Sequence, residues 1–225
     1  MTLKSKIMII ILSILCLVTV FFAGYTNDGY SQKRIQVNTP RDALIRLISG
    51  NDLFIIANTN RANISRKRRF QTAHEGQNPY AAIVTCSDSR LSPEHIFQEG
   101  IGDLFVVRTA GNVLSNFDIS SLEYAAFILG VKVIIIMGHS NCGAVSASIL
   151  ANNNIENNHI ENIINEIKSN LENVHNLEEA IIKNAKSSMS KLLENELFLE
   201  LIVKKELVIT SAHYEMKTGK VTFFY

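Results

Sequence analysis

Short apolar runs, each closed by a polar turn, dominate the hydrophobic pattern of this chain. The two strongest span residues 80–85 (YAAIVT) and 131–137 (VKVIIIM). Their short length, their β-branched residues and the polar turns that follow predict buried parallel strands rather than helices. Weaker patterns of the same kind predict three more strands, at residues 103–108, 207–210 and 221–225.

Apolar residues at helical spacing separate these strands. A first helix is expected from Pro40, which suits a first helical turn, to a stop at Gly50-Asn51. A crossover helix is expected over residues 120–129, with Ser120 or Ser121 as its N-cap. Further helices are expected at residues 143–150, 152–176 and 180–193. The alternation predicts an α/β fold, with a central and mostly parallel β-sheet flanked by helices.

The N-terminal residues 1–24 differ from the rest of the chain. Lys4 and Lys6 form a short basic region, and an apolar run over residues 7–22 follows. This order is typical of a signal peptide, and it predicts export, to the periplasm if the source is bacterial.

The leader could be cleaved off or could stay as a membrane anchor. Ala23 suits the last position of a cleaved peptide, but Phe21 is large for the position two residues earlier. Residues 7–23 could therefore remain as a membrane anchor. In either case we expect a linker over residues 25–39 and one domain over residues 40–225.

Composition narrows the choice of partners. The chain has 22 basic and 21 acidic residues and a net charge of +1, which gives no electrostatic reason to expect a nucleic acid or an acidic partner. The basic run at residues 66–69 (RKRR) is expected to be a solvated face, with a membrane-surface or nucleic-acid role as the alternative. Outside the leader only Cys86 and Cys142 remain, so no disulfide framework is expected.

The residues that can carry chemistry follow the two strongest strands. Residues 86–90 (CSDSR) come after the first, and residues 139–142 (HSNC) after the second. The carboxyl ends of strands in an open α/β sheet form the crevice in which ligands bind. Two cysteines and one histidine converging there predict a zinc site with three protein ligands and an open fourth position, which is typical of catalytic zinc.

Two other interpretations of these residues stay open at this point. A free cysteine taken alone is more often a small buried core residue than a ligand. A cysteine nucleophile with a histidine base is the other chemical alternative. It has weak support, because residues 138–142 lack the second glycine of a G-x-S-x-G nucleophile elbow.

With these motifs in place, the chain resembles the β-class carbonic anhydrases over roughly residues 40–225. The pairing of C-x-D-x-R with H-x-x-C at this separation is highly specific, whereas either half alone is weak. The resemblance is also carried by residues 96–112 (IFQEGIGDLFVVRTAGN), 120–131 (SSLEYAAFILGV) and 212–224 (AHYEMKTGKVTFF).

The resemblance implies a reaction and a ligand set. Cys86, His139 and Cys142 would hold one Zn²⁺ per subunit, and zinc-bound hydroxide would convert carbon dioxide reversibly to bicarbonate and a proton. Asp88 and Arg90 would form a dyad in which the arginine holds the carboxylate off the metal.

The resemblance also implies a pocket, an assembly and an edge strand. Gln77 would donate its side-chain amide to a substrate oxygen. The pocket would be lined by Phe105, Ala110, Tyr124 and Gly143, partly from an adjacent subunit of a homodimer or dimer-based oligomer. For Phe105 and Ala110 the alternative is ordinary core packing. The segment after residue 218 would form an antiparallel edge strand.

Two rival functions share these motifs. Related enzymes with the same ligands hydrolyse carbon disulfide or carbonyl sulfide, and a non-catalytic zinc-binding relative is the alternative from another class. The presence of Asp88, Arg90 and Gln77 argues against the non-catalytic relative, because a purely structural zinc site does not need them.

Overall fold

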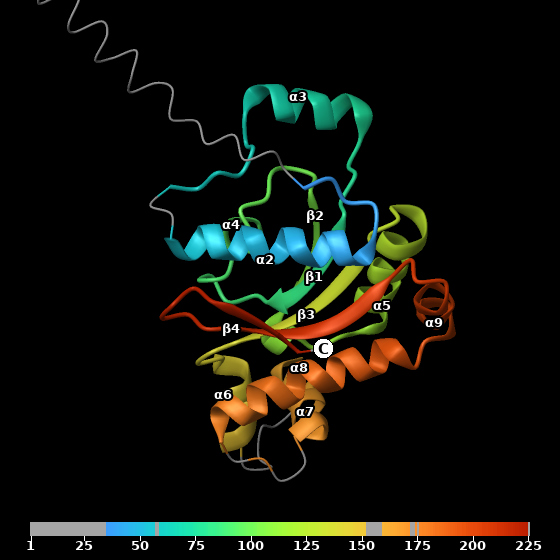
Figure 1. Cartoon of the computed structure of the whole chain (residues 1–225). Helices are drawn as coiled ribbons and strands as arrows, with labels where there is room; N and C mark the ends of the chain where they lie inside the picture. Colours follow the sequence, from blue (N-terminus) through green and yellow to red (C-terminus); the bar gives the residue numbers. More distant parts are fainter. Residues whose placement is uncertain (1–34, 57–58, 152–158, 172–173, 175, 225) are drawn as a thin grey trace, which may run out of the picture. The chain divides into compact units, whose positions relative to one another are not determined.

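A five-stranded β-sheet with the strand order β2-β1-β3-β4-β5 forms the centre of the structure, a computed structural model (Figure 1). Neighbouring strands are parallel except for β4 and β5, which pair antiparallel. The strands are β1 (Ala81–Cys86), β2 (Leu104–Thr109), β3 (Val133–His139), β4 (Val208–Tyr214) and β5 (Val221–Phe224). The predicted α/β class, the mostly parallel sheet and the antiparallel edge strand are confirmed.

The structure describes residues 35–224 apart from 57–58, 152–158, 172–173 and 175. Residues from Gln36 onward form one compact unit. The expected signal peptide or anchor at residues 1–24 lies outside the described residues. Within the described part of the chain, no helix has the length and apolar character needed to cross a membrane.

The two central strands extend farther toward their carboxyl ends than their apolar runs suggested. β1 and β3 end at Cys86 and His139, which the sequence placed in the turns that follow. β4 continues beyond the predicted Thr210 to Tyr214, because its last residues pair with the end of β3 as far as His139. Every residue of β1 and β3 is buried, as expected for strands covered on both faces.

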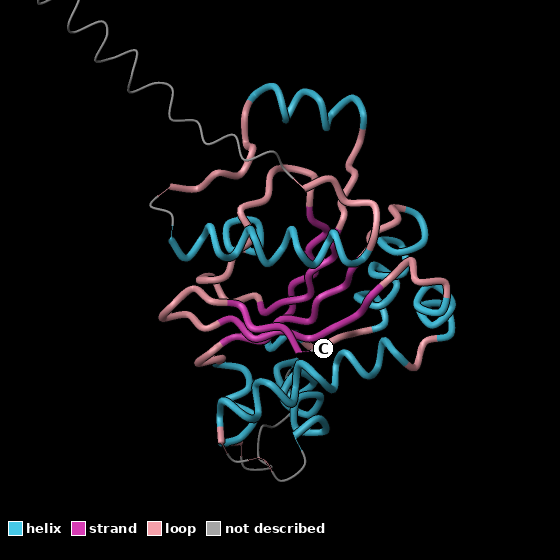
Figure 2. The backbone as a smooth tube through the Cα atoms, viewed as in Figure 1, coloured by secondary structure: helices cyan, strands magenta, loops and turns pink. Residues whose placement is uncertain are grey.

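Helices cover both faces of the sheet (Figures 1 and 2). On one face, Ile83 and Ile135 belong to the same apolar cluster as Leu47 of α2. On the other face, the alternate side chains pack against helices α5, α8 and α9. The helices are α2 (Pro40–Ile56), α3 (Arg66–Glu75), α4 (Pro93–Ile96), α5 (Asn116–Glu123), α6 (Gly143–Leu150), α7 (His159–Leu171), α8 (Leu177–Leu193) and α9 (Glu196–Val203).

The predicted stop of the first helix at Gly50-Asn51 is wrong. Gly50 is needed for close packing, because a Cβ atom there would collide with the carbonyl oxygen of Phe97. The buried Asn51 side chain donates to Gly219 O at 2.8 Å and accepts from Val221 N at 2.8 Å. Gly50 thus lets α2 approach Phe97, and Asn51 joins α2 to residues 219–221. The helix continues to Ile56.

The crossover helix begins earlier than predicted. Ser115, not Ser120 or Ser121, is the N-cap of α5, and it forms a capping box with Asp118. The S-x-x-D pattern is a known start signal, so the local sequence did contain the cap. The helix then changes to a π-helix over Tyr124–Ile128.

The basic run lies at the start of α3, a helix that the sequence analysis did not predict. This helix has no buried residue, which agrees with the expected solvated face. One residue of the basic run is an exception, because Arg68 forms hydrogen bonds within the protein. Its Nη2 donates to Asp103 Oδ1 at 2.9 Å, and its Nε donates to Ile101 O at 2.8 Å. Arg68 therefore attaches α3 to the turn before β2.

Candidate metal centre

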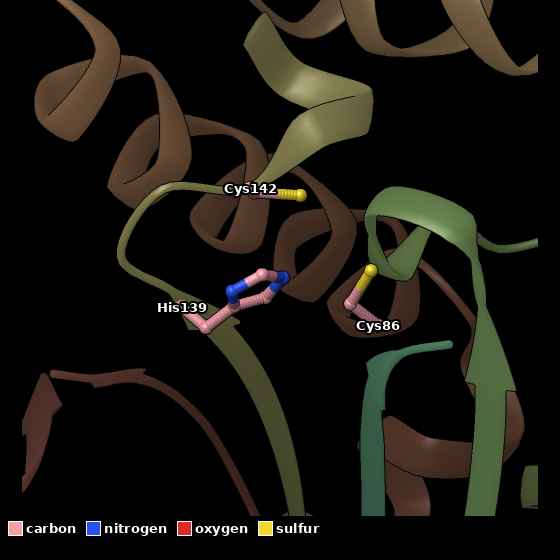
Figure 3. Close-up of side chains that lie close together, drawn as sticks. All are labelled: Cys86, His139 and Cys142. Carbon is pink, nitrogen blue, oxygen red and sulfur yellow. The ribbon is translucent and has the colours of Figure 1, made fainter. Parts of the chain in front are cut away.

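Three side chains from separate segments meet at the carboxyl edge of the sheet (Figure 3). Cys86 is the last residue of β1, His139 is the last residue of β3, and Cys142 is the N-cap of α6. Because β1 and β3 are neighbouring parallel strands, their ends lie side by side. The two sulfur atoms and a ring nitrogen lie within 4.8 Å of one another, and all three residues are buried.

The histidine presents a free nitrogen to this cluster. His139 Nδ1 lies 3.0 Å from the carbonyl oxygen of Ser140, so this nitrogen carries the proton. Its Nε2 is buried and has no hydrogen-bond partner among the described residues. A buried imidazole nitrogen with an unused lone pair is costly unless something binds it.

The donor set fits zinc. Two thiols and one imidazole nitrogen match the soft and borderline ligands that zinc prefers, and three ligands leave the fourth position open. Both cysteines are free, so neither sulfur is committed to a disulfide. The carbonyl that orients His139 is the kind of outer partner that fixes the tautomer of a metal-binding imidazole.

The contact between the two sulfur atoms shifts their pKa values in opposite directions. The hydrogen bond with Cys142 lowers the pKa of the Cys86 thiol to about 4. The same contact, together with burial, raises the pKa of Cys142. The amides at the start of α6 favour the Cys142 thiolate, but the contact with Cys86 outweighs them.

Backbone amides support the Cys86 sulfur. Gly111 N donates to Cys86 Sγ at 3.2 Å. Gly111 lies in the 3₁₀ turn Ala110–Asn112 after β2 and has a φ of 67°, which favours glycine. A Cβ atom there would also lie only 2.6 Å from Ile167 Cδ1. The conformation that aims this amide at the sulfur therefore requires glycine, and the sequence analysis did not identify this residue.

The predicted dyad residues are in contact beside the cluster. Arg90 Nε donates to Asp88 Oδ1 at 2.9 Å, and Arg90 Nη2 donates to Asp88 Oδ2 at 2.7 Å. These bonds hold the pKa of Asp88 well below its usual range. The carboxylate is therefore ionised at neutral pH and held by a two-point contact.

Arg108 supports the same loop, a contact that the sequence analysis did not predict. Its Nη2 donates to Asp88 O at 2.7 Å, and its Nε donates to Cys86 O at 3.2 Å. The side chain comes from β2, the neighbour of β1. Arg108 thus holds the main chain that carries both a metal ligand and the acidic residue of the dyad.

The predicted pocket residues divide into two groups. Ala110 precedes Gly111 in the turn, and Gly143 follows Cys142, so both lie beside the cluster. Phe105 pairs with Ala82 on β1, four residues before Cys86, which corresponds to about 13 Å along the strand. The Phe105 ring lies 6.4 Å from that of Tyr124, centroid to centroid.

Gln77 lies farther from the cluster of its own chain. It precedes Ala81, the first residue of β1, whereas Cys86 ends that strand. The strand itself spans about 16 Å. Gln77 is exposed. Within one chain, Gln77, Phe105 and Tyr124 therefore lie away from Cys86. The resemblance implied that some pocket residues come from an adjacent subunit, and the roles of these three stay predictions.

The fold and the site together define an α/β protein with a Cys2His metal centre at the edge of a parallel sheet. The family model described as "Carbonic anhydrase" matches residues 81–221. The chain belongs to the carbonic anhydrase family, and its structural neighbours place it in the β class.

Individual relatives agree with this placement. Carbonic anhydrase 2 of Mycobacterium tuberculosis is 43% identical over 107 residues, which cover 48% of this chain and 51% of that protein. The match thus spans about half the length of this curated relative.

Solved structures extend the likeness over more of the chain. The structure of the β-carbonic anhydrase CcaA has a TM-score of 0.63 and 25% identity, and the match covers 81% of this chain and 95% of that one. A tetrameric β-carbonic anhydrase from Sordaria macrospora has a TM-score of 0.61 and 25% identity, with coverage of 71% and 87%.

Proposed function

We propose that this protein catalyses the reversible hydration of carbon dioxide to bicarbonate and a proton. The observation that carries the proposal is the cluster of only three protein ligands among the described residues, Cys86, His139 and Cys142, with the Asp88 carboxylate beside it. A structural zinc site has four protein ligands, whereas a catalytic site keeps one position for water or substrate. The family membership supports the same reaction.

The chain's own residues would bind and orient the reactants. Cys86, His139 and Cys142 would hold the zinc ion. When bound, the zinc ion would act as a Lewis acid and so lower the pKa of a water ligand. Asp88 accepts hydrogen bonds but cannot donate one while ionised, so it would orient the O–H of the attacking water. Arg90 holds this carboxylate by two hydrogen bonds, which would keep it from binding the metal directly.

We further propose that the working unit is a homodimer, or a larger oligomer built from dimers. Gln77, Phe105 and Tyr124 lie at a distance from the metal ligands of their own chain. They would therefore serve the metal site of a second copy. Tyr124 is 46% exposed, which leaves its ring accessible to a neighbouring chain. The Sordaria macrospora relative, which is described as tetrameric, supports an assembly of this kind.

A complementation experiment tests the shared site. Gln77→Ala and Asp88→Ala subunits, each expected to be poorly active alone, are unfolded, mixed and refolded together. If Gln77 acts in the partner's site, half of the mixed dimers' sites regain both residues, and activity rises above that of either variant. Analytical ultracentrifugation checks that mixed dimers form. Mixed dimers with no gain in activity would contradict the proposal.

Stopped-flow measurement of carbon dioxide hydration tests the reaction itself. The sample is protein lacking residues 1–24 with its zinc content quantified. We expect hydration that disappears when zinc is chelated and returns when zinc is restored. Full zinc occupancy without hydration between about pH 6.5 and 9 would contradict the proposal. Parallel assays with carbonyl sulfide and carbon disulfide then separate the sulfur-substrate hydrolase from a non-catalytic relative.

We also propose that the protein is exported, to the periplasm in a bacterial source. The basic start and apolar run of residues 1–24 support this proposal. The mass of the protein recovered from its native host distinguishes a cleaved leader from an anchor at residues 7–23. An intact mass in the soluble cytosolic fraction would contradict export.

A further inference from the structure

A chain of hydrogen bonds leads from two buried asparagines to the Cys86 sulfur. Asn170 Nδ2 donates to Asn184 Oδ1 at 3.0 Å, and Asn184 Nδ2 donates to Gly111 O at 2.8 Å. Gly111 N in turn donates to Cys86 Sγ at 3.2 Å. These hydrogen bonds connect α7, α8 and the turn after β2 to the end of β1.

The two asparagines occupy positions where apolar side chains are expected. Asn184 is fully buried, and Asn170 is 6% exposed. Each lies within a helix among buried apolar residues, such as Ile167 and Ile181. Burying an amide costs free energy unless its polar atoms are paired, so packing alone would favour leucine or alanine here. The pairing seen here satisfies that requirement and gives the amides a specific orientation.

The orientation of the Asn184 amide follows from its neighbours. Its oxygen faces a donor, Asn170 Nδ2, and its nitrogen faces an acceptor, Gly111 O. A flipped amide would place oxygen against oxygen and nitrogen against nitrogen. Asn170 therefore keeps the Asn184 donor directed at the glycine carbonyl, and through it holds the peptide units of the turn.

The turn is also confined by apolar contacts. A Cβ atom on Gly111 would lie 2.6 Å from Ile167 Cδ1 and 3.2 Å from Ala144 Cβ. Ile167 and Ala144 therefore leave no room for a side chain at this position, but neither forms a hydrogen bond with the Gly111 peptide units. The hydrogen bond from Asn184 restrains these units, because it binds the carbonyl of the same residue whose amide meets the sulfur.

We propose that Asn184, oriented by Asn170, is a positioning residue that holds the Gly111 amide on Cys86 Sγ and thereby sets zinc binding by that sulfur. An amide that donates to a thiolate stabilises its negative charge and orients its lone pairs. Outer partners of this kind tune the affinity of a metal site. The inference rests on the metal centre and does not require carbon dioxide to be the substrate.

Zinc affinity and a cobalt spectrum test this role in the full chain. Asn184→Leu removes the donor and keeps the number and branching of the side-chain heavy atoms. We expect zinc binding, measured by competition with a chromogenic chelator, to weaken roughly 10- to 100-fold. In the Co²⁺-substituted protein, the thiolate-to-cobalt absorption band should move to longer wavelength, since the sulfur loses a hydrogen bond and becomes more electron-rich.

Ser188→Ala is the matched control on the same helix. Ser188 Oγ donates to the next carbonyl of the turn, Asn112 O, at 3.4 Å. This hydrogen bond does not involve Gly111. The control should keep wild-type zinc affinity and cobalt spectrum. Equal losses in Ser188→Ala and Asn184→Leu would show that any loosening of the turn suffices, which would overturn the proposal.

A second variant covers the case in which Asn184→Leu does not fold. Asn170→Ala keeps the Asn184 donor but frees its amide to rotate, so we expect a smaller shift in the same direction. Asn162→Ala, at an exposed position of the same helix, is its control. Folded Asn170→Ala protein with wild-type zinc affinity and cobalt band would overturn the proposal. Because neither readout is catalytic, a negative result differs from failure of the hydration assay.

Discussion

Replacing Asp88 by alanine is expected to lower kcat/KM for carbon dioxide hydration by roughly a hundredfold or more, with zinc content unchanged. The carboxylate is the ionised acceptor held beside the metal ligands, and alanine cannot orient an attacking water. Stopped-flow hydration with metal analysis of the same sample measures both quantities. A zinc-loaded variant that retains wild-type activity would remove Asp88 from the mechanism.

The loss of kcat/KM caused by Asp88→Ala should not change with pH in the assay range. The two-point contact with Arg90 lowers the pKa of Asp88 below its ordinary value near 4. A lowered pKa means that the carboxylate stays ionised as the pH rises and becomes protonated only in strong acid. Asp52→Ala, which removes an exposed carboxylate from α2, is a suitable control and should be fully active.

Replacing Cys86 by serine is expected to abolish both zinc binding and activity. A serine hydroxyl stays protonated at neutral pH and is a poor zinc ligand, whereas the structure stabilises a thiolate at this position. The loss of zinc affinity should exceed the roughly 10- to 100-fold that removal of an outer partner costs. Chelator competition measures the affinity, and circular dichroism checks that the variant remains folded.

Ser89→Ala is the matched control for this experiment. Ser89 is exposed in the same loop and is not a member of the ligand cluster. It should bind zinc and hydrate carbon dioxide like the wild type. Full zinc occupancy and activity in folded Cys86→Ser protein would contradict the ligand assignment.

The sheet and the ligand set could be predicted because their signals are local. A short β-branched run followed by a polar turn indicates a strand and its carboxyl end without knowledge of any neighbour. Parallel strands bring those ends to one edge, so the sequence alone places Cys86 and His139 together. Errors at this level were small shifts at strand ends, where pairing with a neighbour extends a strand past its apolar run.

Gly50 and Asn51 show how a local signal can mislead. A glycine followed by asparagine is a common helix stop, yet α2 continues through both residues. Both residues serve tertiary packing. Gly50 allows close approach to Phe97, and Asn51 forms hydrogen bonds with Gly219 and Val221, which are far away in sequence. No helical periodicity contains this information, because it depends on which segments pack against α2.

The sequence by itself determined the α/β alternation, the zinc-type donor set and the acidic and basic pair two residues apart at Asp88 and Arg90. Only the tertiary structure decided which distant residues support that set. Asn184 meets Gly111 across 73 positions of the chain. Likewise, Gln77 lies at the opposite end of β1 from Cys86, although the two are near in sequence. Hydrogen bonds and pocket walls depend on proximity in space, which folding creates between segments that no local pattern connects.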